Sequence, residues 1–167
     1  IFEELYQNSI INYTSSTRSD DYQTSSILYI CGGSSCTNSY FEDLVEWRHK
    51  QGYIVTVIPT SESGSSENSI NNYISNAYYL WENPPEIVGL VGDVGGSYNI
   101  ACDYYEWGSG WNTYEGASDV KYTYIEGNDL TPEIVIGRIS ADSSSDLNNI
   151  INKTIQYEKA QLQTDLG

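Results

Sequence analysis

The sequence is poor in basic residues, and this shortage limits its partners. Its 167 residues include 7 Lys and Arg against 23 Asp and Glu, so its formal net charge is -16 at pH 7. Nucleic-acid phosphates and anionic lipid surfaces both bind clusters of Lys and Arg. The composition therefore predicts no nucleic-acid partner and no anionic membrane surface. It favours a cation as ligand, and the alternative is that the acidity only keeps a secreted protein soluble.

Histidine and long apolar runs are also scarce. The only histidine is His49, and no apolar run reaches the about 18 residues that a membrane span requires. We therefore predict no membrane span and no zinc site built on histidines. Abundant Ser, Thr, Asn and Tyr beside few Lys are typical of secreted, extracellular or cell-surface proteins.

Cysteine is sparse as well, but two of the three cysteines lie close together in the sequence. Cys31 and Cys36 flank a Gly-Gly-Ser-Ser loop that is flexible enough to bring them together. We predict a local disulfide between them, and two free thiols at a strand end are the alternative. Cys102 is left over, either free or paired with a group outside this segment.

Apolar periodicity predicts strands that alternate with helices. Short β-branched runs bounded by Gly or Pro indicate buried strands, and apolar residues at helical spacing indicate amphipathic helices. This alternation predicts an α/β domain with a doubly wound, mainly parallel four-stranded sheet flanked by helices. We expect strands over 26–31, 53–58, 87–92 and 133–139, and helices over about 39–51, 66–82 and 143–163.

Two segments fall outside this alternation. Residues 1–25 are polar and indicate an N-terminal arm or connector, which leaves residues 26–167 as the α/β subdomain. Residues 93–124 contain Gly, Trp and Tyr without clear periodicity, so we predict a long loop or a loop with a small hairpin. Ordered loops of this length are usually functional.

Carboxylates at the strand ends are the strongest candidates for a binding site. Asp93 follows the third strand, and Asp129 and Glu133 precede the fourth. Because these strands are expected to be neighbours, we expect the three side chains to meet at one edge of the sheet. Calcium binds several carboxylate and carbonyl oxygens, and a Gly-Asn-Asp turn supplies both kinds. The alternative is that Asp129 satisfies a turn and Asp93 caps a loop.

A nucleophilic active site has little support in the sequence. A Ser or Cys nucleophile needs a base, and His49 lies near the end of a predicted helix. Helix C-termini lie near the rim opposite the strand carboxyl ends, which argues against a dyad with Cys31 or Cys102. The sequence also lacks GxGxxG and GxxxxGK[ST], so nucleotide binding is not expected.

Several collinear motifs resemble the gingipain family of secreted bacterial cysteine endopeptidases. The resemblance covers about residues 26–160. The stretch at 127–140, GNDLTPEIVIGRIS, is the most specific of these motifs. The others are FEDLVEWRHKQGY at 41–53, YYLWENPPE at 78–86, VGLVGD at 88–93, SDVKY at 118–122 and TIQYE at 154–158.

The resemblance implies the first subdomain of a caspase-like catalytic domain built from two α/β subdomains. The family's catalytic His lies in a Gly-His-Gly motif and its nucleophile in an Ala-Cys-Val-Asn-Gly motif, both in the second subdomain. Neither motif occurs in this sequence. No catalytic residue can be assigned here, and this segment alone is predicted to be inactive.

The resemblance also implies one structural calcium ion. Asp93, Asp129 and Glu133 would be side-chain ligands, and Glu126 and Thr131 would supply backbone carbonyls. The loop from Cys31 to Cys36 and the long segment after Asp93 depart from the family pattern.

The function implied by the resemblance is that of a non-catalytic N-terminal subdomain of a secreted gingipain-like cysteine endopeptidase. It would scaffold the C-terminal catalytic subdomain of the same gene product and meet protein or peptide substrates through it. One alternative is a non-catalytic extracellular adhesive or assembly-forming module, whose partners would include further copies of itself. Another is a flavodoxin-like domain that binds a small molecule.

Overall fold

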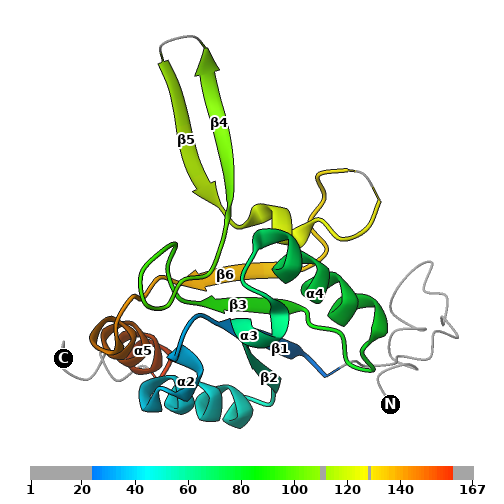
Figure 1. Ribbon diagram of the computed structural model, residues 1–167. Coiled ribbons are helices and arrows are strands. Elements are labelled where there is room, and N and C mark those ends of the chain that lie inside the picture. Colours follow the sequence, from blue (N-terminus) through cyan, green and yellow to red (C-terminus); the bar gives the residue numbers. More distant parts are fainter. Residues whose placement is uncertain (1–23, 110–111, 128, 160–167) are drawn as a thin grey trace, which may run out of the picture.

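A four-stranded parallel sheet forms the centre of the computed structural model, which describes residues 24–109, 112–127 and 129–159 (Figure 1). Neighbouring strands are parallel throughout, in the order β2-β1-β3-β6. This order confirms the expected α/β class with a doubly wound parallel sheet. Residues 1–23 of the predicted arm lie outside the described residues. The strands are β1 (Ser26–Cys31), β2 (Ile54–Pro59), β3 (Ile87–Val91) and β6 (Val135–Ile139).

Helices cover both faces of this sheet. On one face lie α2 (Ser39–Lys50) and α5 (Ser144–Glu158), and on the other lie α3 (Thr60–Ser63) and α4 (Glu67–Leu80) (Figure 1). Every residue of β1 is buried, because a central parallel strand is covered on both faces.

The core has two halves that are separated by the sheet. Alternate residues of β1 point to opposite faces, so Leu28 and Ile30 belong to one half while Ile27 and Tyr29 belong to the other. The first half is completed mainly by α4 and the second by α2 and α5.

The helix starts follow local capping signals in the sequence. Ser66 caps α4 through a reciprocal capping box with Ser69, and the side chain of Ser143 caps α5 by accepting from Asp146 N at 3.1 Å. The expected extension of the last helix toward Gln163 runs into residues outside the described part of the chain.

The long segment after β3 contains an antiparallel hairpin of β4 (Asp103–Ser109) and β5 (Asn112–Ser118). It stands away from the sheet and its helices (Figure 1). A short 3-10 helix, η2 (Val120–Thr123), follows it, and another, η1 (Ser35–Thr37), follows β1. Within the described ranges, no helix is long and apolar enough to cross a membrane.

Candidate functional site

Asp93 lies at the carboxyl edge of the sheet, just after β3. Its Oδ1 accepts a hydrogen bond from Val94 N at 2.8 Å, and its carbonyl accepts one from Ile100 N at 2.9 Å. The side chain therefore stabilises its own loop, as in the alternative considered from the sequence.

Arg138 is the main organising side chain at this edge. Its guanidinium donates to Asp119 from Nε at 2.8 Å and from Nη2 at 2.7 Å. It also donates to the carbonyls of Gly92, Ile100 and Ala101 at 3.1–3.2 Å. Arg138 thus ties the segment that enters the hairpin to the residue that follows it.

The Arg138–Asp119 pair is largely shielded from solvent, with side-chain exposures of 10% and 19%. Burial opposes the charge of the guanidinium, but the hydrogen bonds and the charge of Asp119 raise the pKa of Arg138 on balance. Arg138 lies within the motif at 127–140, from which no role was predicted for it. A lone Arg within an otherwise apolar strand was the available signal.

A cavity of about 300 Å³ adjoins this pair and is lined by Asp93, Cys102, Asp119 and Arg138, among others. It holds charges of both signs and a thiol, but no imidazole. It therefore lacks the base that a thiol nucleophile requires.

The other predicted ligands lie at the amino edge of the sheet, in the loop before β6. Glu133 Oε2 accepts from the backbone nitrogens of Ile125 and Glu126 at 2.7 and 3.2 Å. Asp129 Oδ1 accepts from Thr131 N at 2.8 Å. The carboxylate of Glu126 accepts from the hydroxyl of Tyr78 at 3.0 Å.

The structure shows that the expected meeting of Asp93 with Asp129 and Glu133 was wrong. Asp93 follows β3 whereas Glu133 precedes β6, and these two strands are parallel. The two carboxylates therefore lie at opposite edges, as the loops at either end of β3 and β6 show (Figure 1). The strands alone separate them by about 13 Å, several times a calcium–oxygen distance.

The set of five predicted residues therefore does not fit a single calcium ion. Glu126, Asp129, Thr131 and Glu133 remain together in one loop, where two of the carboxylates already accept backbone hydrogen bonds. Among the described residues, no group of three or more His, Cys, Asp or Glu side chains is arranged to hold a metal. Asn128, inside this loop, lies outside the described residues.

Cys31 and Cys36 lie close together at the carboxyl edge, as free thiols joined by a hydrogen bond. Their loop is held by Gly32 N and the Ser35 hydroxyl, which donate to the carbonyl of Val91 at 3.0 and 2.8 Å. The hydrogen bond with Cys36, together with burial, raises the pKa of Cys31. The same hydrogen bond lowers the pKa of the more exposed Cys36. The two thiols are thus close enough to form a hydrogen bond, and the disulfide between them stays a prediction.

His49 lies in the last turn of α2 and is exposed. Since α2 runs back from the carboxyl edge, where β1 and η1 end, its last turn lies at the amino edge. Cys31, at the end of β1, lies at the opposite edge of the sheet. The geometry therefore agrees with the expectation that these two side chains form no dyad.

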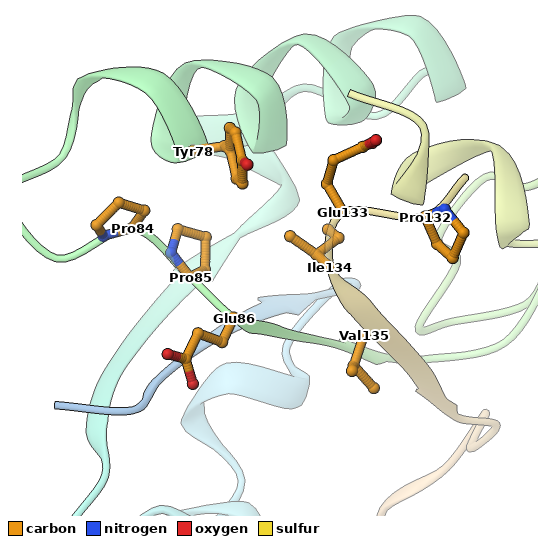
Figure 2. A pocket seen from close by; sticks show the side chains of 8 residues that line it. All are labelled: Tyr78, Pro84, Pro85, Glu86, Pro132, Glu133, Ile134 and Val135. Atoms are coloured by element: carbon orange, nitrogen blue, oxygen red, sulfur yellow. The ribbon is translucent and has the colours of Figure 1, made fainter. Parts of the chain in front are cut away.

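A cavity of about 600 Å³ lies at the amino edge (Figure 2). Tyr78 of α4 lies on one side, and Pro132 and Ile134 lie on the other (Figure 2). Its two carboxylates, Glu86 and Glu133, point away from one another (Figure 2). They do not form the converging pair that acid–base catalysis requires.

Comparison with known proteins identifies the family. The sequence profile of peptidase family C25 matches residues 20–166. The chain belongs to peptidase family C25. Among its relatives is gingipain R2 of Porphyromonas gingivalis, which is 28% identical over 162 residues, or 95% of this chain.

Solved structures of this C25 family show the same fold. The crystal structure of the Arg specific cysteine proteinase gingipain R is 26% identical and covers 81% of this chain with a TM-score of 0.64. The complex of the pro- and mature domains of Porphyromonas gingivalis RgpB is 27% identical and covers 78%, with a TM-score of 0.62. These likenesses confirm the caspase-like α/β class.

The chain spans only part of these C25 relatives. It covers 20% of the length of gingipain R2 and 28% of each of the two solved chains.

Proposed function

We propose that this chain is the non-catalytic amino-terminal subdomain of a secreted gingipain-like cysteine endopeptidase. The observation that carries the proposal is that the candidate nucleophiles and the candidate base of this chain lie at opposite edges of the sheet. Cys31 and Cys102 lie at the carboxyl edge of the sheet, and His49 lies at the amino edge. Within the described residues, neither of these two thiols is thus placed beside the imidazole. The family match over residues 20–166 supports the peptidase context.

The chain's role in such an enzyme is that of a scaffold. The outer side of β6 carries no further strand among the described residues, and Val135 on this strand is 64% exposed. Covering by another element is one way in which native proteins protect an exposed edge strand. The catalytic subdomain of the same gene product is the partner we propose for this side, and protein or peptide substrates would be bound through it.

Two further expectations belong to this proposal. A secreted or cell-surface location is supported by the acidic, lysine-poor composition. Calcium is retained as a ligand of the loop from Glu126 to Glu133 alone. When bound, it would neutralise repulsion among the carboxylates there and stabilise the connection into β6.

The direct test is an assay of peptide cleavage by the 167-residue chain beside the complete gene product. We expect no turnover by the chain and thiol-dependent turnover by the product. Thiol-sensitive turnover by the chain alone would overturn the claim that it is non-catalytic. A complete product without Gly-His-Gly and Ala-Cys-Val-Asn-Gly motifs would contradict the peptidase context.

An adhesive module is the second candidate, and the hairpin is the observation that favours it. Tyr104, Tyr105 and Tyr114 are 53%, 44% and 56% exposed on an arm that stands away from the body. The same assay discriminates the two, because an adhesive module would be inactive even as part of the complete product.

A further inference from the structure

Side-chain contacts hold the β4–β5 hairpin where it joins the body of the protein, a place that we call its root. At the root, Asp119 is held by two hydrogen bonds from Arg138, and Lys121 lies 3.6 Å from Asp103. Beyond the root the two strands stand away from the sheet (Figure 1). An isolated two-stranded hairpin is only marginally stable in water, so a projecting arm gains stability from a partner.

The two faces of the hairpin differ in chemistry. Side chains alternate between faces along a strand, and the register pairs Glu106 with Glu115. Tyr104, Glu106 and Glu115 therefore share one face, which we call the acidic face. Tyr105 and Tyr114 belong to the opposite face, because each is one residue away from a member of the acidic face.

The acidic face contains an uncompensated electrostatic repulsion. Glu106 and Glu115 are directly opposite and both exposed, an arrangement that destabilises a strand pair. The ion pairs seen in the described ranges involve other carboxylates, and none joins a Lys or Arg to Glu106 or Glu115. A cation bound between the two carboxylates would remove this repulsion.

Tyr104 places an aromatic ring on the same face, two residues from Glu106. Its hydroxyl forms a hydrogen bond with the side chain of Cys102, which raises the pKa of Tyr104 and links its polar tip to the root. Tyr104 is 53% exposed. An aromatic ring beside carboxylates is a favourable setting for guanidinium and ammonium groups, which bind both.

We propose that the acidic face of the hairpin, formed by Tyr104, Glu106 and Glu115, binds an extended segment of a partner polypeptide that carries Arg or Lys at alternate positions. Residues two apart on a strand are separated by about 6.6 Å, on the hairpin and on an extended partner alike. One cationic side chain then lies over Tyr104 while the next lies between the two carboxylates.

A second copy of this chain does not fit this surface. Each copy has a formal net charge of -16, with 7 Lys and Arg in 167 residues, so two copies repel each other. The charge of the acidic face is complementary to a basic segment of a different polypeptide. This site does not depend on the proposed peptidase role, because binding is measured without any cleavage.

Fluorescence anisotropy tests this proposal with the 167-residue chain and a labelled dodecapeptide that alternates Arg and Ser. We expect saturable binding that weakens with added salt, and no binding of the same peptide with Glu in place of Arg. Glu106→Gln with Glu115→Gln should weaken binding by about tenfold or more, since both carboxylates contact the cation. Tyr104→Leu should weaken it by a smaller factor.

Two control variants separate the acidic face from general acidity and from the other face. Glu42→Gln with Glu82→Gln changes the net charge equally at exposed positions outside the hairpin. Tyr105→Ser changes the opposite face. Both should bind within about twofold of the unmodified chain. Equal losses in the hairpin and control charge variants, or no binding by the unmodified chain, would overturn the proposal. Circular dichroism shows whether each variant is folded.

Discussion

The guanidinium of Arg138 binds the carboxylate of Asp119 through two hydrogen bonds, 2.8 Å from Nε to Oδ2 and 2.7 Å from Nη2 to Oδ1. The two residues are 19 positions apart in the sequence, since Arg138 lies on β6 and Asp119 follows the hairpin. This pair, with the carbonyls that Arg138 also binds, fixes how the hairpin leaves the sheet.

Replacing Arg138 should therefore destabilise the fold more than replacing an exposed cation. Arg138→Gln leaves Asp119 and three carbonyls without their donor, which we expect to cost about 2–4 kcal/mol of the free energy of unfolding. Urea unfolding measures this loss. Lys50→Gln, which removes the exposed pair with Glu46, should cost much less of the free energy of unfolding, because solvent screens that pair. Equal losses in both variants would show that Arg138 does not hold the hairpin root.

A calcium titration distinguishes the loop site from the site first expected at one edge. We expect calcium to raise the melting temperature over a chelator control, because a ligand that binds only the folded state stabilises it. Asp129→Ala should remove most of this gain, whereas Asp93→Ala should leave it intact because Asp93 lies at the opposite edge.

Each of the other results of this titration has a distinct meaning. No shift with calcium would reject the loop site. If Asp93→Ala lost as much of the rise in melting temperature as Asp129→Ala, Asp93 would contribute to calcium binding despite its distance from the loop.

The contact between Glu158 and Arg48 predicts a specific pH dependence of stability. Glu158 accepts from Arg48 at 2.7 and 2.8 Å and also from Trp47 and Gln51. These bonds, with Arg48 as the largest cause, lower the pKa of Glu158. A carboxyl whose pKa is lowered on folding contributes stability above its unfolded pKa, about 4.3, and loses it as the pH falls through the folded value.

Thermal unfolding between pH 7 and pH 3 tests this dependence. Glu158→Gln should lower the melting temperature at pH 7, and the difference from the unmodified chain should shrink as the pH falls below about 4.3. Glu82→Gln, at an exposed position between α4 and β3, should show little difference at any pH. A difference in melting temperature between Glu158→Gln and the unmodified chain that stays constant from pH 7 to pH 3 would contradict this pH dependence.

The thiol pair predicts both an order of reactivity and a disulfide. The pKa of Cys36 is lowered and that of Cys31 is raised, while Cys31 and Cys102 are buried. Iodoacetamide should therefore modify Cys36 first, as mass spectrometry of the peptides can show.

With oxidised glutathione as oxidant, the thiolate of Cys36 attacks the reagent disulfide and releases one reduced glutathione. Cys31 then displaces the second, so the two protein thiols lose two hydrogens in total. Cys36→Ser should prevent this loss and Cys102→Ser should not. Persistence of three free thiols would reject the disulfide, and earlier labelling of Cys102 would contradict the reactivity order.

The local pattern of the sequence predicted most elements of the sheet and its helices. Strand 26–31 is found as predicted, and two helices begin close to the expected residues 66 and 143, where Ser66 and Ser143 cap them. These features depend on the periodicity of buried residues and on hydrogen bonds between residues that are close in the sequence. Both can be predicted from the order of the residues.

The hairpin is harder to predict from the sequence because its exposed residues show no pattern of burial. Tyr104 and Tyr105 are adjacent and both exposed, so no alternation of polar and apolar residues marks the strand. The sequence predicted a long loop that includes a small hairpin only as one of two outcomes.

The sequence by itself determined the fold class, the family motifs and the excess of carboxylates with few cations. Only the tertiary structure decided which carboxylates share an edge. A residue that follows one parallel strand and a residue that precedes its neighbour lie at opposite ends of the pair, so Asp93 and Glu133 are separated although their strands are adjacent. The role of Arg138 was decided in the same way, because its partners become neighbours only when the chain returns to β6.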